Sequence, residues 1–554
     1  MEERPWHRFY DPQVPRTIRY PELTLYQMLH SAVKDNPRGT AVLFYGRRWS
    51  FERLLHLVDR FSDSLADLGV KQGDRVALVL PNIPGYPIAH FAAAKLGAVL
   101  VPTNPLYVER ELEDQLNDSG AETVVIVDRL LPKLWAIHRN TPVKRIVTMQ
   151  VEDFLPRPMN WLSRLKRGPK RPDLRETSSR VLSFSRLLPR RSAFRPEADI
   201  AVDDTAMLLY TGGTTGVPKG AELTHRNVAA NAYQTRCWLS GMQDGREVIL
   251  CVLPFFHSYG MTTGLHLAVV GRSTMLLVPR FEVPELARQI RRFRPTIFCA
   301  VPSMYNAISR YQGLTAEDVS SIRLSVSGGA ALPAEVQERF EAKTGGRLVE
   351  GYGLTETSPV AIVNPMLGRR KPGTIGIPIS DTEARIVDPD TGEELPPGEV
   401  GELAVRGPQV MKGYWNKPEE TASVLRDGWL LTGDMAVMDE EGYFRIVDRK
   451  KDVIISAGMN IYPREIEEVL MRHPKIAEVA VVGIPSKVRE ETVKAFIVPV
   501  QGSSLSKAEV LEYVKDKLAR YKIPKRIEFV EALPKSVVGK VLKRELVKEE
   551  QRSS

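Results

Sequence analysis

The sequence has little cysteine and no long apolar run. It contains three cysteines in 554 residues, Cys237, Cys251 and Cys299. Their spacing matches neither a disulfide framework nor a metal-binding motif, which excludes a disulfide-stapled secreted domain and favours a reducing cytosol. The most apolar stretch, 88–102, contains a histidine and a lysine and is shorter than the roughly 20 residues of a membrane-spanning helix. The charged beginning, MEERPWHRFYDPQVP, predicts no secretory signal.

The composition is that of a folded protein of more than one domain. Hydrophobic residues make up 43% and charged residues 26%, which excludes a disordered chain. A length of 554 residues exceeds what one hydrophobic core accommodates, so we expect at least two domains. The sequence contains no internal repeats.

The positive charge is confined to one stretch. The formal net charge is +9, and residues 157–191 contain eleven Lys/Arg and two acids, which is the same net charge. The rest of the chain is therefore close to neutral, and the basic excess is a local feature.

Short apolar segments alternate with helical ones in the first part of the chain. Residues 74–82, 123–127 and 145–149 have the pattern of buried strands, and helix-like 92–96 precedes another apolar segment, 97–102. This alternation predicts a mostly parallel sheet with helices on its faces. It is interrupted at 155–196, which is rich in Arg, Pro and Ser and which we interpret as an inserted surface loop. It resumes at 207–210 and continues to about residue 380.

The end of the chain has a different character. Residues 381–447 have β-type signals with turns such as Pro397-Gly398, and the residues from Arg449 mix strands with charged helices. We predict an α/β fold with a large, multi-sheet N-terminal domain, 1–447, and a small, mobile α+β C-terminal domain, 448–554.

The segment YTGGTTGVPKG, 210–220, is the strongest local signal. Its glycines let backbone N–H groups approach phosphate oxygens, its threonines add donors, and its lysine adds a positive charge. The spacing to the lysine is not that of a Walker loop. The alternative, a flexible surface turn, is disfavoured because three threonines alternate with glycines beside a buried strand. The candidate phosphate-binding residues are Thr211, Gly212, Gly213, Thr214, Thr215, Gly216 and Lys219.

This segment resembles the signature loop of the adenylate-forming superfamily, the AMP-binding acyl-CoA synthetases and their relatives. Further motifs of that superfamily occur in order across 45–545. The stretches LPFFHSYGM, 253–261, and KGYWNKPE, 412–419, are most similar to bacterial long-chain fatty acid–CoA ligases. The resemblance implies that the enzyme uses ATP and coenzyme A as co-substrates and Mg²⁺ as cofactor. It also implies a fatty acid as the acyl donor.

The resemblance assigns two glycine-rich turns to the nucleotide. In GYGLTE, 351–356, Tyr352 would pack against adenine, and Glu356 would hold Mg²⁺, with Thr211 as a second oxygen ligand. The alternative for an isolated glutamate is a solvated capping residue. The turn SGGA, 327–330, would contact adenine and the acyl chain, or would only join a strand to a helix. The residues assigned to these two turns are Gly328, Gly329, Ala330, Gly351, Tyr352, Gly353, Thr355 and Glu356.

The same resemblance assigns a ribose clamp and a hinge. Asp434 in Thr432-Gly433-Asp434 would accept hydrogen bonds from two ribose hydroxyls. In DRKKD, 448–452, Arg449 would reach the ribose or the phosphates and Lys451 would be the hinge. The alternative for such a charge run is a solvated face.

Lys540 and Gly458 are implied to serve the two half-reactions. Lys540, in KSVVGK, would bridge the substrate carboxylate and the α-phosphate, although many relatives have Thr-Pro-Ser before the Gly-Lys. Gly458 would leave room for the pantetheine arm, with a turn or bulge glycine as the alternative. The segment 484–491 departs from the usual pattern at Ser486 and Glu490.

His257 would gate the carboxylate side of the pocket, or would be a histidine at the edge of the core. Tyr259, Gly260, Met261 and Gly264 would line the acyl tunnel, with plain core as the alternative. The catalytic candidates are therefore Lys540, Glu356 and His257.

The implied reaction forms acyl-AMP and pyrophosphate and then acyl-CoA and AMP. Rotation about Lys451 would exchange Lys540 for Gly458 between the two steps. The alternatives are a ligase of the same fold for an aryl or medium-chain acid, an acyl-AMP ligase with another acceptor, and a non-catalytic scaffold that binds nucleotide or lipid.

The basic stretch 157–191 has three interpretations. We expect a solvated loop first and contact with anionic lipid second, because basic charge accompanies Trp161 and Phe184. Nucleic-acid binding has no other support. We expect a cytoplasmic enzyme, with peripheral contact with the inner face of the membrane and a homodimer as open expectations.

Overall fold

The computed structural model describes residues 4–156, 159, 180–188, 195–211, 218–456, 459–485, 491–535 and 541–553. Most of the basic stretch, the glycine-rich segment 212–217, and Gly458 and Lys540 lie outside this part of the chain. Beyond the first five residues, the chain forms two compact units. Unit 1 comprises Trp6–Glu383 and Arg406–Leu430, and unit 2 comprises Ala384–Val405 and Leu431–Ser554. The expected start of a mobile C-terminal domain after residue 447 stays a prediction.

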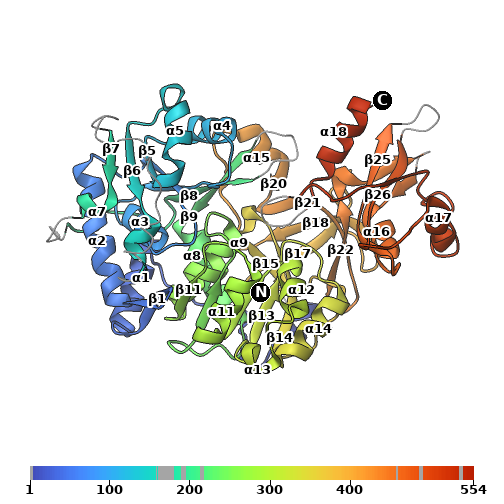
Figure 1. The fold of residues 1–554 in the computed structure, drawn as a ribbon, viewed down its shortest axis with the longest axis horizontal. Helices are drawn as coiled ribbons and strands as arrows, with labels where there is room; N and C mark the ends of the chain where they lie inside the picture. The colour runs from blue at the N-terminus through green and yellow to red at the C-terminus, as the bar shows by residue number, and fades with distance from the viewer. Residues whose placement is uncertain are drawn as a thin grey trace. The chain divides into compact units, whose positions relative to one another are not determined.

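The larger sheet of unit 1 has nine strands, which come from both early and late parts of the unit's sequence (Figure 1). Its six central strands are parallel, and the outer strands β15, β16 and β2 run antiparallel to their neighbours. In spatial order the strands are β16 (Ile377–Pro378), β15 (Val360–Val363), β14 (Arg347–Gly353), β13 (Leu324–Ser327), β12 (Ile297–Ala300), β10 (Val248–Cys251), β11 (Thr274–Leu277), β1 (Thr40–Phe44) and β2 (Arg47–Ser50).

The second sheet of unit 1 has eight strands, of which β8, β4, β3, β5, β6 and β7 are parallel. Its other end is antiparallel, because β9 turns back along β8 and β19 pairs with β9. In spatial order the strands are β19 (Gly413–Tyr414), β9 (Lys219–Thr224), β8 (Thr205–Thr211), β4 (Val99–Pro102), β3 (Arg75–Val79), β5 (Thr123–Val127), β6 (Arg145–Met149) and β7 (Val181–Ser183). The short strand β20 (Leu425–Arg426) pairs with the beginning of β21.

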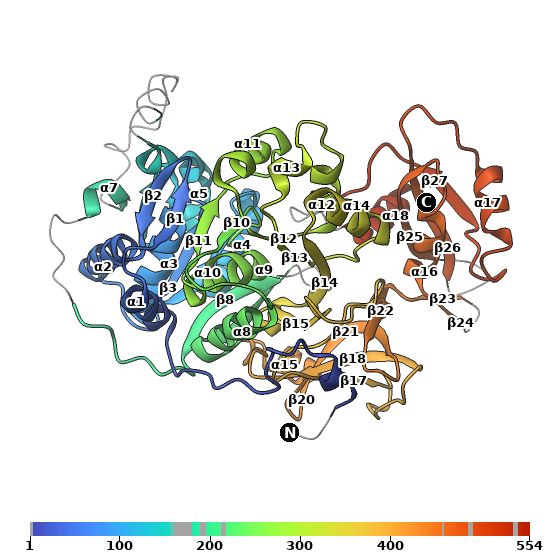
Figure 2. The ribbon, with the colours of Figure 1, turned by 90° about the horizontal axis from the view of Figure 1, so that it is seen from below.

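A layer of buried helices lies between the two sheets. In Figure 2, α1, α3 and α10 lie in this layer. Helix α2 contacts β1 and the π-helix η5 contacts β10, both in the nine-stranded sheet. Helix α3 contacts β3 and β4, and α8 contacts β9, all in the eight-stranded sheet, so the layer packs on both sheets. The members are α1 (Leu25–Asp35), α2 (Phe51–Asp67), α3 (Gly85–Lys95), α8 (His225–Trp238), α9 (Ser258–Gly260), η5 (Met261–His266) and α10 (Leu267–Val270).

Further helices cover the outer faces of both sheets. One core joins β10, β11 and β12 to α11, α12 and α14, and another joins β3, β5 and β6 to α4 and α5. The remaining helices of unit 1 are η1 (Pro5–Phe9), α4 (Glu109–Ser119), η2 (Asp128–Leu130), α5 (Leu131–Ile137), η3 (His138–Asn140), η4 (Val151–Phe154), α7 (Phe184–Leu187), α11 (Val283–Phe293), α12 (Pro302–Arg310), α13 (Ala316–Val319), α14 (Ala334–Thr344), η6 (Thr355–Thr357) and α15 (Pro418–Val424).

Unit 2 is built from short sheets and helices around its own core, which includes Ile454, Ile466 and Val481. A first group of strands is β17 (Glu383–Val387), β18 (Val400–Arg406), β21 (Trp429–Met438) and β22 (Phe444–Arg449). A hairpin, β23 (Ile454–Ser456) and β24 (Met459–Ile461), and a three-stranded sheet, β25 (Ile476–Pro485), β26 (Glu491–Pro499) and β27 (Arg526–Phe529), follow. The helices are η7 (Lys450–Asp452), α16 (Pro463–Met471), α17 (Lys507–Lys515) and α18 (Lys543–Ser553).

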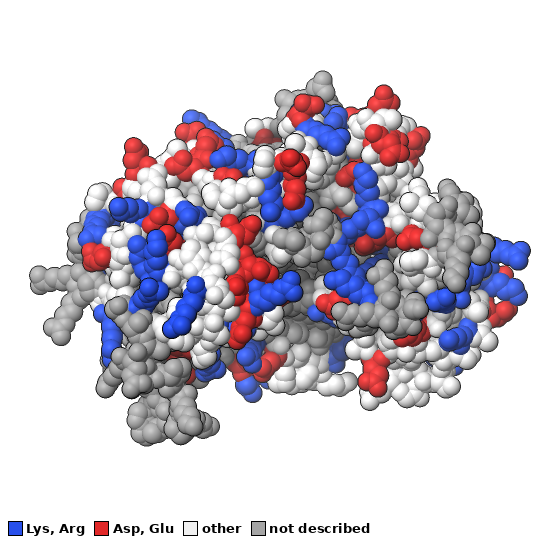
Figure 3. Space-filling view, turned by 90° about the horizontal axis from the view of Figure 1, so that it is seen from above, with Lys and Arg blue, Asp and Glu red and all other residues white. Residues whose placement is uncertain are grey.

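The predicted fold class is confirmed. The expected strands 123–127 and 145–149 are β5 and β6, and the strand within 74–82 is β3. The β-type region 381–447 contains β17, β18, β21 and β22. Figure 3 shows acidic and basic side chains interspersed over the described part of one face, in keeping with a near-neutral chain outside the basic stretch.

Candidate active site

The predicted adenine and magnesium loop leaves the end of β14 and enters η6. The strand carries Gly351, Tyr352 and Gly353, and η6 carries Thr355 and Glu356. Gly353 packs directly on the backbone, since a Cβ there would lie 1.7 Å from the Pro359 carbonyl oxygen. Gly353 is therefore needed for close backbone approach, whatever ligand the loop binds.

The predicted turn after β13 lies beside this loop, because β13 and β14 are paired. Gly328 is buried, with the position of its missing Cβ 3.1 Å from the Tyr259 ring, whereas Gly329 has φ +79° and Ala330 is exposed. Tyr259 itself is anchored by a 2.7 Å hydrogen bond from its hydroxyl to the Val326 carbonyl oxygen. The turn thus follows a parallel strand at its carboxyl end, where ligands bind in sheets of this kind.

The two strands that flank the predicted phosphate loop, β8 and β9, lie at the antiparallel end of the other sheet. Thr211 is the last residue of β8, Lys219 is the first of β9, and the two are register partners. The residues between them that were assigned to phosphate, Gly212, Gly213, Thr214, Thr215 and Gly216, lie outside the described part of the chain.

The structure brings the predicted adenine and magnesium loop against the two strands that flank the predicted phosphate loop. Helix η6 contacts both β8 and β9. The link is made by the segment before α15: the Met411 amide donates to the Glu356 carbonyl oxygen at 2.8 Å, and the Lys412 amide donates to that of Glu222 at 3.0 Å. Strand β19 then pairs with β9. Residues far apart in sequence therefore form one site in unit 1.

Tyr414 and Glu420 are site residues that the sequence reasoning missed. The Tyr414 hydroxyl donates a 2.8 Å hydrogen bond to Glu356 Oε1. The Lys219 ammonium lies 5.2 Å from the centroid of the Tyr414 ring and forms an ion pair with Glu420. Burial, followed by the charge of Glu356, raises the pKa of Tyr414, so this hydroxyl is a donor at neutral pH. The available signal for Tyr414 was the segment 412–419, which carries the family resemblance; Glu420 lies just beyond it.

His257 lies at the start of α9, beyond the end of β10. Its Nδ1 accepts a hydrogen bond from the Tyr259 amide at 3.2 Å, which makes it the capping residue of that short helix. The side chain is half-buried. The structure therefore gives His257 a local structural contact, and its gating role stays a prediction.

In unit 2 the structure pairs two predicted residues with each other. Asp434 and Arg449 are register partners on β21 and β22, and Arg449 Nε lies 2.7 Å from Asp434 Oδ1. Asp434 is almost completely buried, so its charge is compensated within the unit. Lys451 is exposed in η7.

A half-buried lysine near the predicted hinge segment, Lys543, was not predicted. Lys543 Nζ lies 2.7 Å from Glu467 Oε1. Burial alone lowers the pKa of Lys543, but the charges of Glu467 and Asp448 outweigh it and raise the pKa. Asp448 accepts hydrogen bonds from the amides of Arg449 and Arg464. The hinge residues are therefore tied to α16 and α18 within unit 2.

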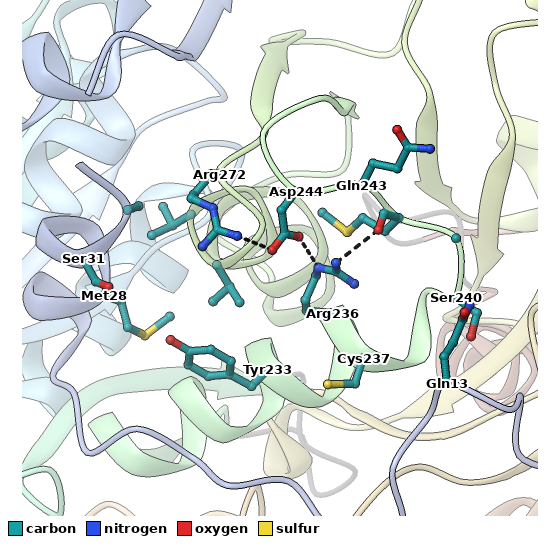
Figure 4. Close-up of a pocket in the computed structure, with 15 residues that line it drawn as sticks. Gln13, Met28, Ser31, Tyr233, Arg236, Cys237, Ser240, Gln243, Asp244 and Arg272 are labelled. Carbon is teal, nitrogen blue, oxygen red and sulfur yellow. Dashed lines mark hydrogen bonds and ion pairs between the residues drawn. The ribbon is translucent and has the colours of Figure 1, made fainter. Parts of the chain in front are cut away.

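A separate pocket of about 580 Å³ lies between α1, α8 and α10 and contains none of the predicted site residues (Figure 4). Asp244 forms ion pairs with both Arg236 and Arg272, and Arg272 also pairs with Asp35. Each guanidinium in this pocket is thus already paired within the protein.

Among the described residues, no helix combines the length and the apolar character needed to cross a bilayer. The same residues contain no group of three or more His, Cys, Asp or Glu side chains arranged to hold a metal ion.

The chain matches known proteins over nearly its whole length. Residues 29–415 match the AMP-binding enzyme family, and residues 465–540 match the AMP-binding enzyme C-terminal domain. A long-chain-fatty-acid–CoA ligase from Bacillus subtilis is 43% identical, over 99% of each chain. A feruloyl-CoA synthase from an Amycolatopsis species is 35% identical, over 92% of this chain and 96% of the relative.

Solved structures agree with these matches. The crystal structure of ATP-bound MatB from Rhodopseudomonas palustris superimposes with a TM-score of 0.85 at 31% identity, over 96% of this chain and 99% of MatB. Together with the two family matches, this confirms the resemblance inferred from the motifs. The chain belongs to the AMP-binding enzyme family and carries both the large domain and the C-terminal domain of that family.

Proposed function

We propose that the chain activates a long-chain fatty acid with ATP, giving acyl-AMP and pyrophosphate, and transfers the acyl group to coenzyme A, giving acyl-CoA and AMP. The observation that carries the proposal is the convergence of Lys219 and Glu356, from different sheets, on the single side chain of Tyr414. The names of the full-length relatives support the fatty acid and coenzyme A.

The donor set at Glu356 fits Mg²⁺. One carboxylate oxygen accepts the Tyr414 hydrogen bond, so the group keeps further lone pairs for a hard cation. Mg²⁺ in nucleotide sites takes one or two protein oxygens and completes its shell with water and phosphate oxygens, which Glu356 and Thr211 would allow. When bound, the ion would offset the negative charge that builds up on the phosphates.

The chain's own residues act on charge and position. The substrate carboxylate and the α-phosphate repel each other, so the reaction needs cations at the point of contact. Lys219 supplies one from the start of β9, and Lys540, which lies outside the described residues, is proposed to supply another in the first half-reaction only. Asp434 is proposed to hold the ribose and Gly458 to admit the thiol arm in the second half-reaction.

The test is pyrophosphate release and thioester formation with palmitate, octanoate and a cinnamate, each with and without coenzyme A. We expect palmitate-dependent pyrophosphate release and palmitoyl-CoA formation. Preferential use of the cinnamate would favour the aryl-acid alternative, which the 35% identical feruloyl-CoA synthase supports. Acyl-AMP that accumulates and is not transferred to coenzyme A would contradict the second step.

We also propose a cytoplasmic location with peripheral contact with anionic membranes through 157–191, supported by its charge of +9. Deletion of 157–179, which leaves β7 and the buried Phe184 in place, is expected to weaken binding to anionic vesicles while turnover of a soluble substrate persists. Unchanged vesicle binding would remove the lipid interpretation. The homodimer remains a proposal that sedimentation equilibrium tests directly.

A further inference from the structure

The segment 411–421, called here the β19–α15 segment, is fixed to the candidate site by its backbone. Besides the Met411 and Lys412 bonds, the Trp415 amide donates to the Gly220 carbonyl oxygen at 2.8 Å. The turn into α15 is closed by Thr421, whose hydroxyl accepts from the Tyr414 amide at 2.9 Å and donates to the Lys417 carbonyl oxygen at 2.8 Å. The backbone of this segment is therefore held in place beside the site, which fixes the positions from which its side chains reach the site.

Tyr414 contacts both charged groups of the site in different ways. Its hydroxyl occupies one oxygen of Glu356, which restricts the rotation of that carboxylate. Its ring lies under the Lys219 ammonium, where a cation–π contact attracts the charge. One side chain thus sets the relative position of the predicted metal ligand and the predicted phosphate-binding lysine.

Glu420 forms its ion pair with Lys219. The Lys219 side chain is 17% exposed and that of Glu420 is 39% exposed, so the ion pair is only partly screened by water. An ammonium has three N–H donors, which allows it to contact a carboxylate and a phosphate oxygen together. The Glu420 charge nevertheless repels a phosphate that approaches the same ammonium.

We propose that the β19–α15 segment tunes the charge of the nucleotide site: Tyr414 is a positioning residue that orients Glu356 toward the metal, and Glu420 is a counter-ion that competes with nucleotide phosphate for Lys219. This inference rests on the proposed function. It predicts opposite effects of the two side chains on nucleotide affinity, which a purely structural role would not produce. It also gives Glu420 a role in pyrophosphate release, because renewed pairing of Glu420 with Lys219 weakens the interaction of Lys219 with pyrophosphate.

The Tyr414 part is tested with Tyr414→Phe, which keeps the ring and removes the hydroxyl. ATP binding to the full chain is measured by calorimetry with Mg²⁺ and with EDTA. We expect the dissociation constant for Mg·ATP to rise about tenfold, as expected for loss of a hydrogen bond to a charged group, and that for ATP in EDTA to change by less than about twofold. KM for Mg·ATP should rise more than kcat falls.

Tyr26→Phe is the matched control. The Tyr26 hydroxyl donates to Asp59 at 2.9 Å, and Lys95 lies 5.2 Å from the Tyr26 ring centroid, so the same three chemical groups meet outside the candidate site. This variant should lose stability through its own broken hydrogen bond while binding Mg·ATP as the wild type does. Equal Mg·ATP affinity of Tyr414→Phe and wild type would overturn the role of Tyr414.

The Glu420 part is tested with Glu420→Gln, which removes the charge and keeps the shape. We expect dissociation constants for ATP, with or without Mg²⁺, and for pyrophosphate to fall about threefold to fivefold, the range for a partly exposed ion pair. Glu122→Gln, which breaks the 2.6 Å pair with Lys144 at another edge of unit 1, should change neither constant. Weaker or unchanged binding by Glu420→Gln would overturn the counter-ion role.

The proposed function and the role of the β19–α15 segment can be refuted separately. Absence of ATP binding and of adenylate formation in the wild-type protein would contradict the proposed function itself. Wild-type protein that forms acyl-AMP, together with Tyr414 and Glu420 variants that bind nucleotide normally, would leave the proposed function standing and remove this inference. Thermal melting of each variant identifies any that fails to fold, and for such a variant Tyr414→His or Glu420→Ala replaces it.

Discussion

Three buried histidines should make the protein sensitive to mild acid. His90, His225 and His266 lie in the helix layer between the two sheets and are at most 1% exposed. His90 and His266 share a 3.1 Å contact between their Nε2 atoms. Burial lowers the pKa of His225 to about 4 and of His266 to about 3, and burial followed by the charge of His266 lowers that of His90 well below its usual value.

The direction of the effect follows from which state takes up protons. In the unfolded chain a histidine has a pKa of about 6.5, so it is protonated as the pH falls below that value, whereas the folded protein keeps these three neutral. Stability is therefore retained above pH 6.5 and lost below it, down to the folded pKa. At about 1.4 kcal/mol per pH unit, His225 and His266 should each cost about 2 kcal/mol at pH 5, and His90 adds to the loss.

The assay is denaturant unfolding at pH 7.5 and pH 5.0. The wild type should lose at least about 4 kcal/mol between the two, a large share of a typical stability of about 5–15 kcal/mol. His225→Gln should lose about 2 kcal/mol less over the same interval, although it starts from a lower value at pH 7.5. His30→Gln, which removes an exposed histidine, is the control. A His225→Gln variant with the full wild-type pH dependence would refute the reasoning.

Three further predictions concern function and packing. Lys540→Ala should abolish adenylate formation and largely spare thioester formation from supplied acyl-AMP; equal loss in both assays would contradict the division of labour between the half-reactions. Asp11→Ala should lower the melting temperature by removing about 2 kcal/mol or more, because its buried carboxylate accepts the two amides of 367–368; an unchanged melting temperature would contradict this. Gly353→Ala should impair ATP binding more than acid binding, since the new methyl group meets Pro359, and a normal ATP affinity would show that the loop tolerates the shift.

Local pattern predicted much of the fold. Strands β5 and β6 were placed correctly because they are short, mostly apolar segments bounded by polar residues, and both are buried along almost their whole length. The change to β-type structure after residue 380 was recognised from its turns. The family was recognised from motifs in which glycine spacing limits the alternatives, and the family matches confirm it.

What the sequence did not reveal depends on contacts between distant segments. The pairing of β1 with β11 has no local signature, because a buried parallel strand looks the same beside any neighbour. Glu420 lies in a polar first turn that resembles any helix start. Only the pairing of β19 with β9 places that turn beside Lys219, so its partnership with the lysine required the structure.

The interleaved order of the nine-stranded sheet has a consequence for how the chain is made. Strand β1 ends at Phe44, but its parallel partner β11 ends at Leu277, so more than two hundred residues must leave the ribosome before the pair can form. At synthesis rates of about 5–20 residues per second, this takes roughly 10 to 50 seconds. During that interval the hairpin of β1 and β2 presents an apolar edge without its partner, which is the kind of surface that chaperones bind and that aggregates when they are scarce. We therefore expect the yield of native protein to respond to translation speed between these two strands more than to the same change after residue 277.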